Sequence, residues 1–195
     1  MLEKKKILRK IIKVRVSAIS ADEKAKREKL LLDNLFSMPE FLAANTVMLF
    51  ANLPDEIGTF SLIDKCIAMG KKVYLPVING DDMTACEFTG EYRVGRYDIK
   101  EPVVKQLVVN DSVPEPVDVL MTGGNNGPEH FDFILVPGVA FSPNGYRLGR
   151  GKGYYDKFLS KYSNPFTVGV CFREQFYLDI PTEPHDIPMQ RVLVI

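Results

Sequence analysis

Residue types that hold metals or form disulfides are scarce in this sequence of 195 residues, which contains three cysteines and two histidines. Cys66, Cys86 and Cys171 form no CxxC pair, and no histidine lies near them at the spacing of a zinc site. An odd number of isolated cysteines does not fit a disulfide framework. The pattern therefore favours a reducing cytoplasm.

A long hydrophobic run and an excess of charge are also missing. No apolar stretch approaches the roughly 20 residues that cross a bilayer. Lys10, Lys13 and Arg15 interrupt the segment in which a signal peptide would have its apolar core. Lys plus Arg and Asp plus Glu number 25 each, so the whole chain has no general attraction to nucleic acid or anionic lipid. We therefore expect a soluble, cytoplasmic protein with neither a membrane nor a nucleic-acid partner.

The length and composition are those of one ordinary globular domain. A chain of this size buries roughly 70% of the surface that it exposes when unfolded. The residues are 46% hydrophobic and 26% charged, which argues against disorder, and the sequence has no internal repeat. We predict a single domain over residues 1–195 and expect a monomer.

The first 29 residues are basic, with 11 Lys or Arg against 4 Asp or Glu. Ser20 followed by Glu23 is a capping-box pattern, which predicts a second helix from there to about Phe36, and Pro39 is expected to end it. Before it, apolar residues at helical spacing predict an amphipathic helix with one basic face; they are Leu2, Ile7, Leu8, Ile11, Ile12 and Val16.

Short apolar runs bounded by Gly or Pro follow, at residues 46–50, 72–75, 133–136, 167–172 and 192–195. Such runs are typical of strands buried on both faces of a mainly parallel sheet. Helices are expected between strands, at residues 59–69 and 153–162, and this alternation predicts an α/β fold, a three-layer sandwich. Residues 79–129 are less regular, and we interpret them as a hairpin followed by a long loop.

The densest chemical signal lies just after the apolar run at residues 133–136. Alternate glycines there free the backbone to bring several N–H groups toward one anion, and the start of a helix would add its dipole. Lys152 is followed by Gly153 where a Walker A motif needs Ser or Thr, and the glycines do not form GxGxxG. The segment therefore predicts a different kind of phosphate site, built from Arg147, Gly149, Arg150, Gly151, Lys152 and Gly153.

Two aromatic residues and a carboxylate complete this segment. Tyr154 and Tyr155 can stack on a heterocycle, and Asp156 can hold Mg²⁺ together with phosphates. The whole segment, PGVAF at residues 137–141 and NGYRLGRGKGYYD at residues 144–156, resembles the signature of the 5-formyltetrahydrofolate cyclo-ligase (methenyltetrahydrofolate synthetase) family. Three further blocks resemble that family in the same order: KKILR at residues 5–9, PDEI at 54–57 and EPHDIPM at 183–189.

The resemblance implies an enzyme that uses ATP and Mg²⁺ to convert 5-formyltetrahydrofolate, with or without a polyglutamate tail, into 5,10-methenyltetrahydrofolate. ADP and phosphate would be released. ATP would phosphorylate the formyl oxygen, and the N10 amine of the same molecule would then attack the activated carbon. This chemistry needs no protein nucleophile, in agreement with the lack of a Ser/His/Asp or Cys/His set in the sequence.

Matching positions carry the family's site residues onto this chain, again as implications of the resemblance. The ATP-binding residues would be Lys5, Lys6, Ile7, Leu8, Arg9, Arg147, Leu148, Gly149, Arg150, Gly151, Lys152, Gly153, Tyr154 and Tyr155. The substrate-binding residues would be Ala51, Glu56, Arg150, Gly151, Lys152, Gly153 and Tyr154. Arg150 and Lys152 would be catalytic, and Asp156 and Asp186 would ligate Mg²⁺.

Simpler structural interpretations stand beside these assignments. Lys5 and Arg9 share a helix face and also fit a solvated basic surface. Glu56 also fits a cap on the following helix, and Asp186 fits a turn in a proline-rich tail. His185 is interpreted as a structural or surface residue rather than a metal ligand.

Other functions and two departures from the family pattern remain open. Related sandwiches host sugar-phosphate isomerases and acyl-CoA-handling proteins, and the basic N-terminal helix could serve a nucleic-acid-binding module. Asp98 stands where the family usually has Gly, which could alter the edge of the pocket. The Gly- and Asn-rich stretch at residues 123–127 resembles an insertion without an assigned role.

Overall fold

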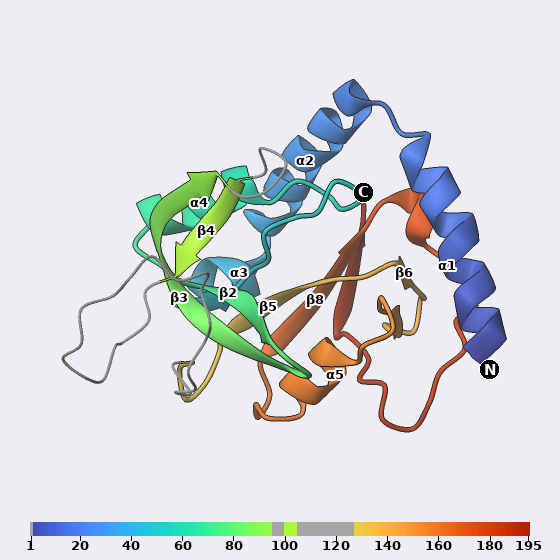
Figure 1. Cartoon of the computed structure of the whole chain (residues 1–195). Coiled ribbons are helices and arrows are strands. Elements are labelled where there is room, and N and C mark those ends of the chain that lie inside the picture. Colours follow the sequence, from blue (N-terminus) through green and yellow to red (C-terminus); the bar gives the residue numbers. More distant parts are fainter. Residues whose placement is uncertain (1, 95–99, 105–126) are drawn as a thin grey trace.

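The computed structural model describes residues 2–94, 100–104 and 127–195. Within these ranges seven strands form one central sheet in the order β4-β3-β2-β1-β5-β8-β9 (Figure 1). All neighbours from β2 to β9 are parallel, whereas β3 pairs antiparallel with both β2 and β4. The strands are β1 (Thr46–Met48), β2 (Lys72–Asn79), β3 (Asp82–Val94), β4 (Lys100–Val104), β5 (Phe133–Pro137), β8 (Phe166–Cys171) and β9 (Arg191–Val194).

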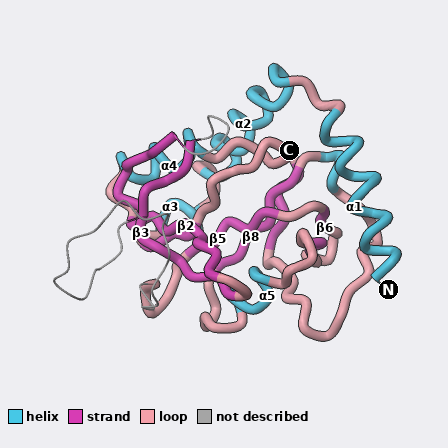
Figure 2. The backbone as a smooth tube through the Cα atoms, in the orientation of Figure 1, coloured by secondary structure: helices cyan, strands magenta, loops and turns pink. Residues whose placement is uncertain are grey.

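Helices surround this sheet, and a small antiparallel pair, β6 (Ala140–Phe141) with β7 (Arg147–Leu148), lies beyond β5 (Figure 2). The helices are α1 (Leu2–Ser17), α2 (Ala21–Leu35), α3 (Pro39–Ala43), α4 (Phe60–Ala68), α5 (Tyr154–Leu159) and the 3-10 helix η2 (Arg173–Gln175). Among the residues that the structure describes, we find no helix with the length and apolar character needed to span a bilayer.

Alternate residues of the central strands enter two separate cores. Val47 of β1 packs in one core with side chains of α1 to α4, whereas its neighbour Met48 packs in the other with Phe158 and Leu159 of α5. Both faces of the strands are therefore covered, which explains why these strands are apolar at successive positions. The predicted α/β three-layer sandwich with a mainly parallel sheet is confirmed.

Most predicted elements are present, with shifted ends. β1 stops at Met48 and β2 continues to Asn79, while the predicted helix at residues 153–162 is the six-residue α5. The predicted hairpin within residues 79–129 corresponds to the antiparallel β3–β4 pair, and β3 follows β2 through a turn at Gly80. Asp98 and most of the predicted long loop, including residues 123–126, lie outside the described residues.

Both predicted N-terminal helices form, but two details differ. Ser20 Oγ accepts a hydrogen bond from the Glu23 amide at 3.2 Å, yet the Glu23 carboxylate pairs with Arg27 at 2.9 Å, so only half of the capping box forms. The prediction that Pro39 ends the second helix is wrong. α2 ends at Leu35, and Pro39 starts α3, because the first helical position needs no amide hydrogen.

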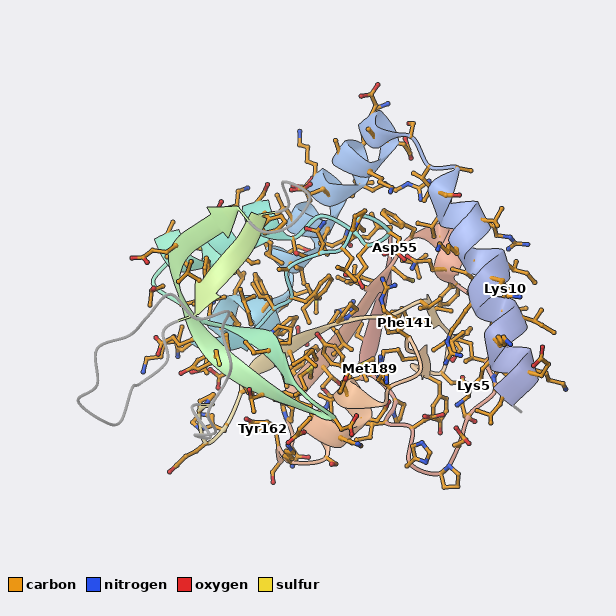
Figure 3. All side chains as sticks on the ribbon, in the orientation of Figure 1. Lys5, Lys10, Asp55, Phe141, Tyr162 and Met189 are labelled. Carbon is orange, nitrogen blue, oxygen red and sulfur yellow. The ribbon has the colours of Figure 1, made fainter. Side chains whose placement is uncertain are left out.

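The predicted apolar face of α1 is only partly buried. Ile12 and Val16 enter the core, but Ile7 and Ile11 remain 49% and 43% exposed, and Lys5 is buried in their place. The physical reason is that the first turns of α1 pack beside the acidic C-terminal loop rather than on the sheet, as Figure 3 shows for Lys5.

Gly145, in the turn between β6 and β7, has a backbone that a side chain would disrupt. Its φ is +80°, and an added β-carbon would lie 2.1 Å from the Met189 carbonyl oxygen. We expect Gly145→Ala to lower the free energy of unfolding by about 3 kcal/mol, because backbone strain and a backbone clash add. Gly70→Ala is the matched control, since Gly70 has a φ of +77° but no heavy atom within 4 Å of an added β-carbon. Urea unfolding should show a loss of about 1 kcal/mol for this control, and equal losses for both variants would contradict the clash.

Candidate functional site

Two cavities lie beside the loop from Arg147 to Gly153. One, here named the Glu56 cavity, has a volume of about 460 Å³, and the other, named the Asp186 cavity, about 700 Å³. Arg147, Gly149, Lys152 and Gly153 line both, so this loop forms their common wall. Both volumes are in the range of small-molecule sites.

The Glu56 cavity is mainly apolar and opens beyond the carboxyl ends of β1 and β5. This is the edge at which open α/β sheets bind ligands. Polar groups come from Glu56 and from the shared loop. Its apolar walls come from four parts of the chain: Phe50, Ala51 and Leu53 after β1, Pro76, Ile78 and Met83 of the β2–β3 hairpin, Pro137 of β5, and Tyr154 and Tyr155 of α5.

The Glu56 carboxylate is oriented by two partners. One oxygen accepts a hydrogen bond from the Leu53 amide at 2.9 Å, and the other pairs with Arg150 Nη2 at 3.1 Å. The side chain is 10% exposed. α4 begins after Thr59, whose amide is held by Asn52 instead, so Glu56 does not cap that helix.

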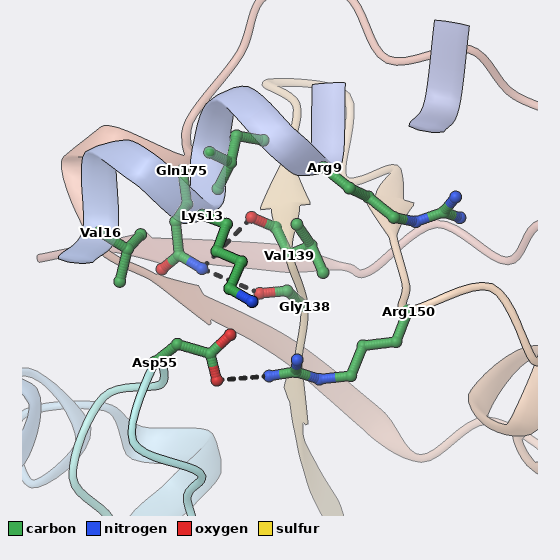
Figure 4. A pocket seen from close by; sticks show the side chains of 9 residues that line it. Arg9, Lys13, Val16, Asp55, Gly138, Val139, Arg150 and Gln175 are labelled. Atoms are coloured by element: carbon green, nitrogen blue, oxygen red, sulfur yellow. Dashed lines mark hydrogen bonds and ion pairs between the residues drawn. The ribbon is translucent and has the colours of Figure 1, made fainter. Parts of the chain in front are cut away.

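Arg150 joins the loop to the segment after β1. Its Nη2 also contacts Asp55 Oδ1 at 2.7 Å, across a small cavity of about 160 Å³ that α1 closes (Figure 4). Burial acts to raise the pKa of Asp55, but the hydrogen bond and the charge of Arg150, together with a backbone hydrogen bond and the charge of Lys13, outweigh it and lower that pKa. Arg150 lines the Glu56 cavity and this smaller one but not the Asp186 cavity.

Three ion pairs lie in the Asp186 cavity. Lys5 Nζ contacts Glu183 at 2.9 Å and Asp186 at 3.3 Å, and Arg147 Nη2 contacts Asp156 at 2.9 Å. Burial acts to lower the pKa of Lys5, but its hydrogen bonds to the two carboxylates raise it on balance. Each predicted metal carboxylate is thus paired with a predicted phosphate-binding cation.

The predicted nucleotide-binding residues divide between these places. Arg9 Nε donates to the Gly149 carbonyl at 2.8 Å and ties α1 to the shared loop. A solvated basic surface therefore does not describe Lys5 and Arg9. Lys152 is exposed and has no ion-pair partner within the described ranges, which leaves its ammonium free to meet an anion. The described linings of the two cavities do not include Lys6, Ile7 or Leu8.

Tyr154 and Tyr155 face the Glu56 cavity rather than the Asp186 cavity. Tyr154 Oη donates to the Gly80 carbonyl at 3.0 Å and thereby joins α5 to the β2–β3 turn. Tyr155 packs under Arg147, whose guanidinium carbon lies 5.2 Å from the ring centre. Arg147 Nε and Tyr155 Oη are buried without a hydrogen-bond partner among the described residues, which marks this corner as incomplete without a ligand.

Comparison with known proteins identifies the group to which this site belongs. The model of the 5-formyltetrahydrofolate cyclo-ligase family matches residues 1–195. The chain belongs to this family. The 5-formyltetrahydrofolate cyclo-ligase of Mus musculus is 29% identical over 200 residues, which cover 97% of this chain and 92% of the mouse protein. The Escherichia coli K12 cyclo-ligase is 27% identical over 185 residues, covering 94% and 96%.

Solved structures agree with this assignment to the cyclo-ligase family. The NMR structure of Aquifex aeolicus 5,10-methenyltetrahydrofolate synthetase has 30% identity and a TM-score of 0.74, and the match covers 97% of this chain and 89% of that one. The synthetase from Mycoplasma pneumoniae has 19% identity and a TM-score of 0.70, covering 96% of each chain, and supports the fold. The chain is therefore an enzyme of the cyclo-ligase family.

The carboxylates of this cyclo-ligase family member suit a magnesium ion. Asp156 and Asp186 line one cavity, and Asp156 Oδ1 accepts a 3.4 Å hydrogen bond from the amide of Ile187, next to Asp186. Oxygen donors of this kind are the ligands that Mg²⁺ prefers, usually with phosphates and waters. Asp186 also accepts from the Glu183 amide at 2.7 Å, so it holds the predicted turn as well. The fit requires that bound phosphates replace Asp186 as the partner of Lys5 and Asp156 as the partner of Arg147.

Sequence reasoning missed several residues of the site. Glu183 is the first residue of the EPHDIPM block, but the sequence assigns it no role. It lies nearer to Lys5 Nζ than Asp186 does. Its ligand atoms and those of His185 and Asp186 lie within 4.8 Å of one another, although the His185 side chain is 71% exposed. The hairpin residues Pro76 and Met83 carried no signal, because they are ordinary apolar residues of a strand pair.

Proposed function

We propose that this enzyme catalyses the ATP- and Mg²⁺-dependent cyclisation of 5-formyltetrahydrofolate to 5,10-methenyltetrahydrofolate, with release of ADP and phosphate. The observation that carries the proposal is the pair of cavities with different chemistry on one cationic loop. An apolar cavity with one carboxylate suits a pterin, and a charged cavity suits a triphosphate with its metal. The formyl oxygen and the γ-phosphate would then meet at the shared loop.

The proposed reaction has two steps. The formyl oxygen attacks the γ-phosphorus and ADP leaves, so the formyl carbon becomes electrophilic and gains a phosphate as leaving group. The N10 nitrogen then attacks that carbon, its proton is lost, and the C–O bond breaks with departure of phosphate. Holding both nitrogens near one carbon contributes the proximity part of the rate, and fixed cations stabilise the charge that moves onto oxygen.

The described contacts suggest how the chain's residues divide this work. Lys5, Arg9 and Arg147 would bind phosphates from the Asp186 cavity, in which Asp156 and Asp186 would hold the magnesium ion. When bound, that ion neutralises phosphate charge. Glu56 and Ala51 would bind the pterin in the other cavity. Arg150 and Lys152 are the proposed catalytic cations, because Arg150 extends from the shared loop to Glu56, and Lys152 has no ion-pair partner among the described residues.

Cellular location and substrate form complete the proposal. The three cysteines are free and buried, and their burial suits the reducing cytoplasm that we propose for the enzyme. Burial raises the pKa of Cys66 and of Cys171 to about 12, so these thiols stay protonated and unreactive. We propose the reduced folate, with or without a polyglutamate tail, as the substrate.

The purified enzyme is expected to form methenyltetrahydrofolate from 5-formyltetrahydrofolate only when ATP and Mg²⁺ are both present. The new conjugated ring gives near-ultraviolet absorbance, which measures the reaction directly. Reactions without ATP, and reactions with ATP and a magnesium chelator, are the controls. Product that appears equally without nucleotide would overturn the phosphorylation scheme, and no product under complete conditions would overturn the proposed activity.

A further inference from the structure

We propose that the Tyr155 hydroxyl binds the substrate by donating a hydrogen bond to its formyl oxygen. The inference rests on the proposed function, and it assigns Tyr155 to the folate rather than to the nucleotide. Three observations support it: an unpaired buried hydroxyl, its place under Arg147 of the wall that the two cavities share, and the chemistry of its neighbours.

The unpaired hydroxyl is the first observation. Tyr155 Oη is buried and has no hydrogen-bond partner in the described part of the chain. Buried polar groups in folded proteins are nearly always paired, since an unpaired one destabilises the fold. Such a group next to a cavity is explained most simply by a ligand that supplies the missing partner. Tyr155 lines the Glu56 cavity, so a ligand bound there would lie beside this side chain.

The second observation is the place of the ring. Tyr155 stacks under Arg147, and Arg147 belongs to the wall that the two cavities share. In the proposed reaction the formyl oxygen must face the γ-phosphate, so that oxygen must lie at the same wall. A donor here would hold the oxygen in the direction of attack.

The third observation is the character of the neighbouring polar groups. A tyrosine hydroxyl carries its proton at neutral pH, so Tyr155 can donate a hydrogen bond. Glu56 only accepts hydrogen bonds when ionised, so it suits the N–H edge of a pterin. The Tyr155 hydroxyl suits a carbonyl oxygen, and the formyl group supplies one where the reaction takes place.

Two ligands and two variants test this assignment. 5-Methyltetrahydrofolate has the same ring system but no formyl oxygen, so the two folates differ at the proposed acceptor. Tyr155→Phe removes only the hydroxyl. Tyr177→Phe is the matched control, because the Tyr177 hydroxyl is also buried without a partner among the described residues. Tyr177 lies under Arg15 of α1 and is not among the described lining of any of the cavities.

Calorimetric titration without nucleotide should show that Tyr155→Phe weakens binding of 5-formyltetrahydrofolate about 10-fold, as expected for one lost hydrogen bond in an apolar site. Binding of 5-methyltetrahydrofolate should be unchanged. Both variants should melt at or above the wild-type temperature without ligand, because each loses an unpaired buried group. Tyr177→Phe should bind both folates normally.

The behaviour of the wild-type enzyme distinguishes failure of the Tyr155 assignment from failure of the proposed function. Normal wild-type turnover with unchanged binding to Tyr155→Phe, or with equal losses for both folates, would overturn the Tyr155 assignment alone. A wild-type enzyme that neither binds nor converts 5-formyltetrahydrofolate would overturn the proposed function and this inference with it. A lower melting temperature for Tyr155→Phe would show that the hydroxyl has a structural partner, and it would also overturn the assignment.

Discussion

Arg150→Ala is expected to lower kcat/KM of the cyclisation by at least about 100-fold. The Arg150 side chain extends from the shared loop to the wall of the Glu56 cavity, where it contacts Asp55 and Glu56. A cation that stabilises charge on the transferring phosphoryl group acts mainly in the transition state, so kcat should fall more than KM rises. The loss of the positive charge also leaves the little-exposed Glu56 carboxylate unpaired, which should weaken folate binding. Initial rates over a matrix of folate and ATP concentrations measure both effects.

Two further substitutions sharpen this test. Arg150→Lys keeps the charge but replaces the planar guanidinium, whose Nη2 contacts both carboxylates, so an intermediate loss of about 10-fold is expected. Arg191→Ala removes an exposed arginine from β9 and should change the rate less than about 2-fold. Circular dichroism and melting curves should show that all three variants remain folded. A folded Arg150→Ala enzyme with a near-normal rate would remove Arg150 from the catalytic groups.

Much of the fold could be predicted because its signals are local. Strands β5 and β8 are continuous apolar runs, and the sheet buries both of their faces. Their composition and hydrophobic period are therefore sufficient to predict them as strands. The site loop was also predictable, because its glycines and cations are contiguous in sequence. Gly151 and Gly153 adopt φ values of +105° and +68°, which glycine tolerates readily.

Features set by distant residues could not be predicted in this way. No pattern around Lys5 predicts that it is buried while Ile7 and Ile11 are exposed, because the partners of Lys5 lie near the other end of the chain. The resemblance implies ATP binding for Tyr154 and Tyr155, and substrate binding for Tyr154 as well. Their orientation depends on how the short helix α5 packs, and both line the Glu56 cavity. Tertiary packing determines both the burial of Lys5 and the orientation of the two tyrosines, and the hydrophobic period of a sequence does not predict such packing.

Paired charges in the Asp186 cavity suggest why a nucleotide and its metal should bind together. In the structure Asp156 pairs with Arg147 and Asp186 pairs with Lys5. ATP alone must compete with these carboxylates for the cations and also approach two negative charges. Metal alone must approach two carboxylates that already have positive partners. When both bind, phosphates take the cations and the metal takes the carboxylates, so each ligand should strengthen the other.

Asp156→Asn is therefore expected to slow turnover by at least about 100-fold and to change nucleotide binding in opposite directions with and without magnesium. The substitution frees Arg147 and removes one negative charge, so ATP in the presence of a chelator should bind more tightly than to the wild type. Removal of a proposed metal ligand should reduce the factor by which Mg²⁺ increases the affinity for ATP. Asp82→Asn is the matched control, because it also removes the charge of a carboxylate paired with a cation, here the exposed Asp82–Lys161 pair, outside the described linings of the cavities. ATP titrations with Mg²⁺ and with chelator, without folate, measure both affinities. An unchanged factor in Asp156→Asn would show that Asp156 does not hold the metal, and weaker binding of metal-free ATP would show that Arg147 does not bind the phosphates.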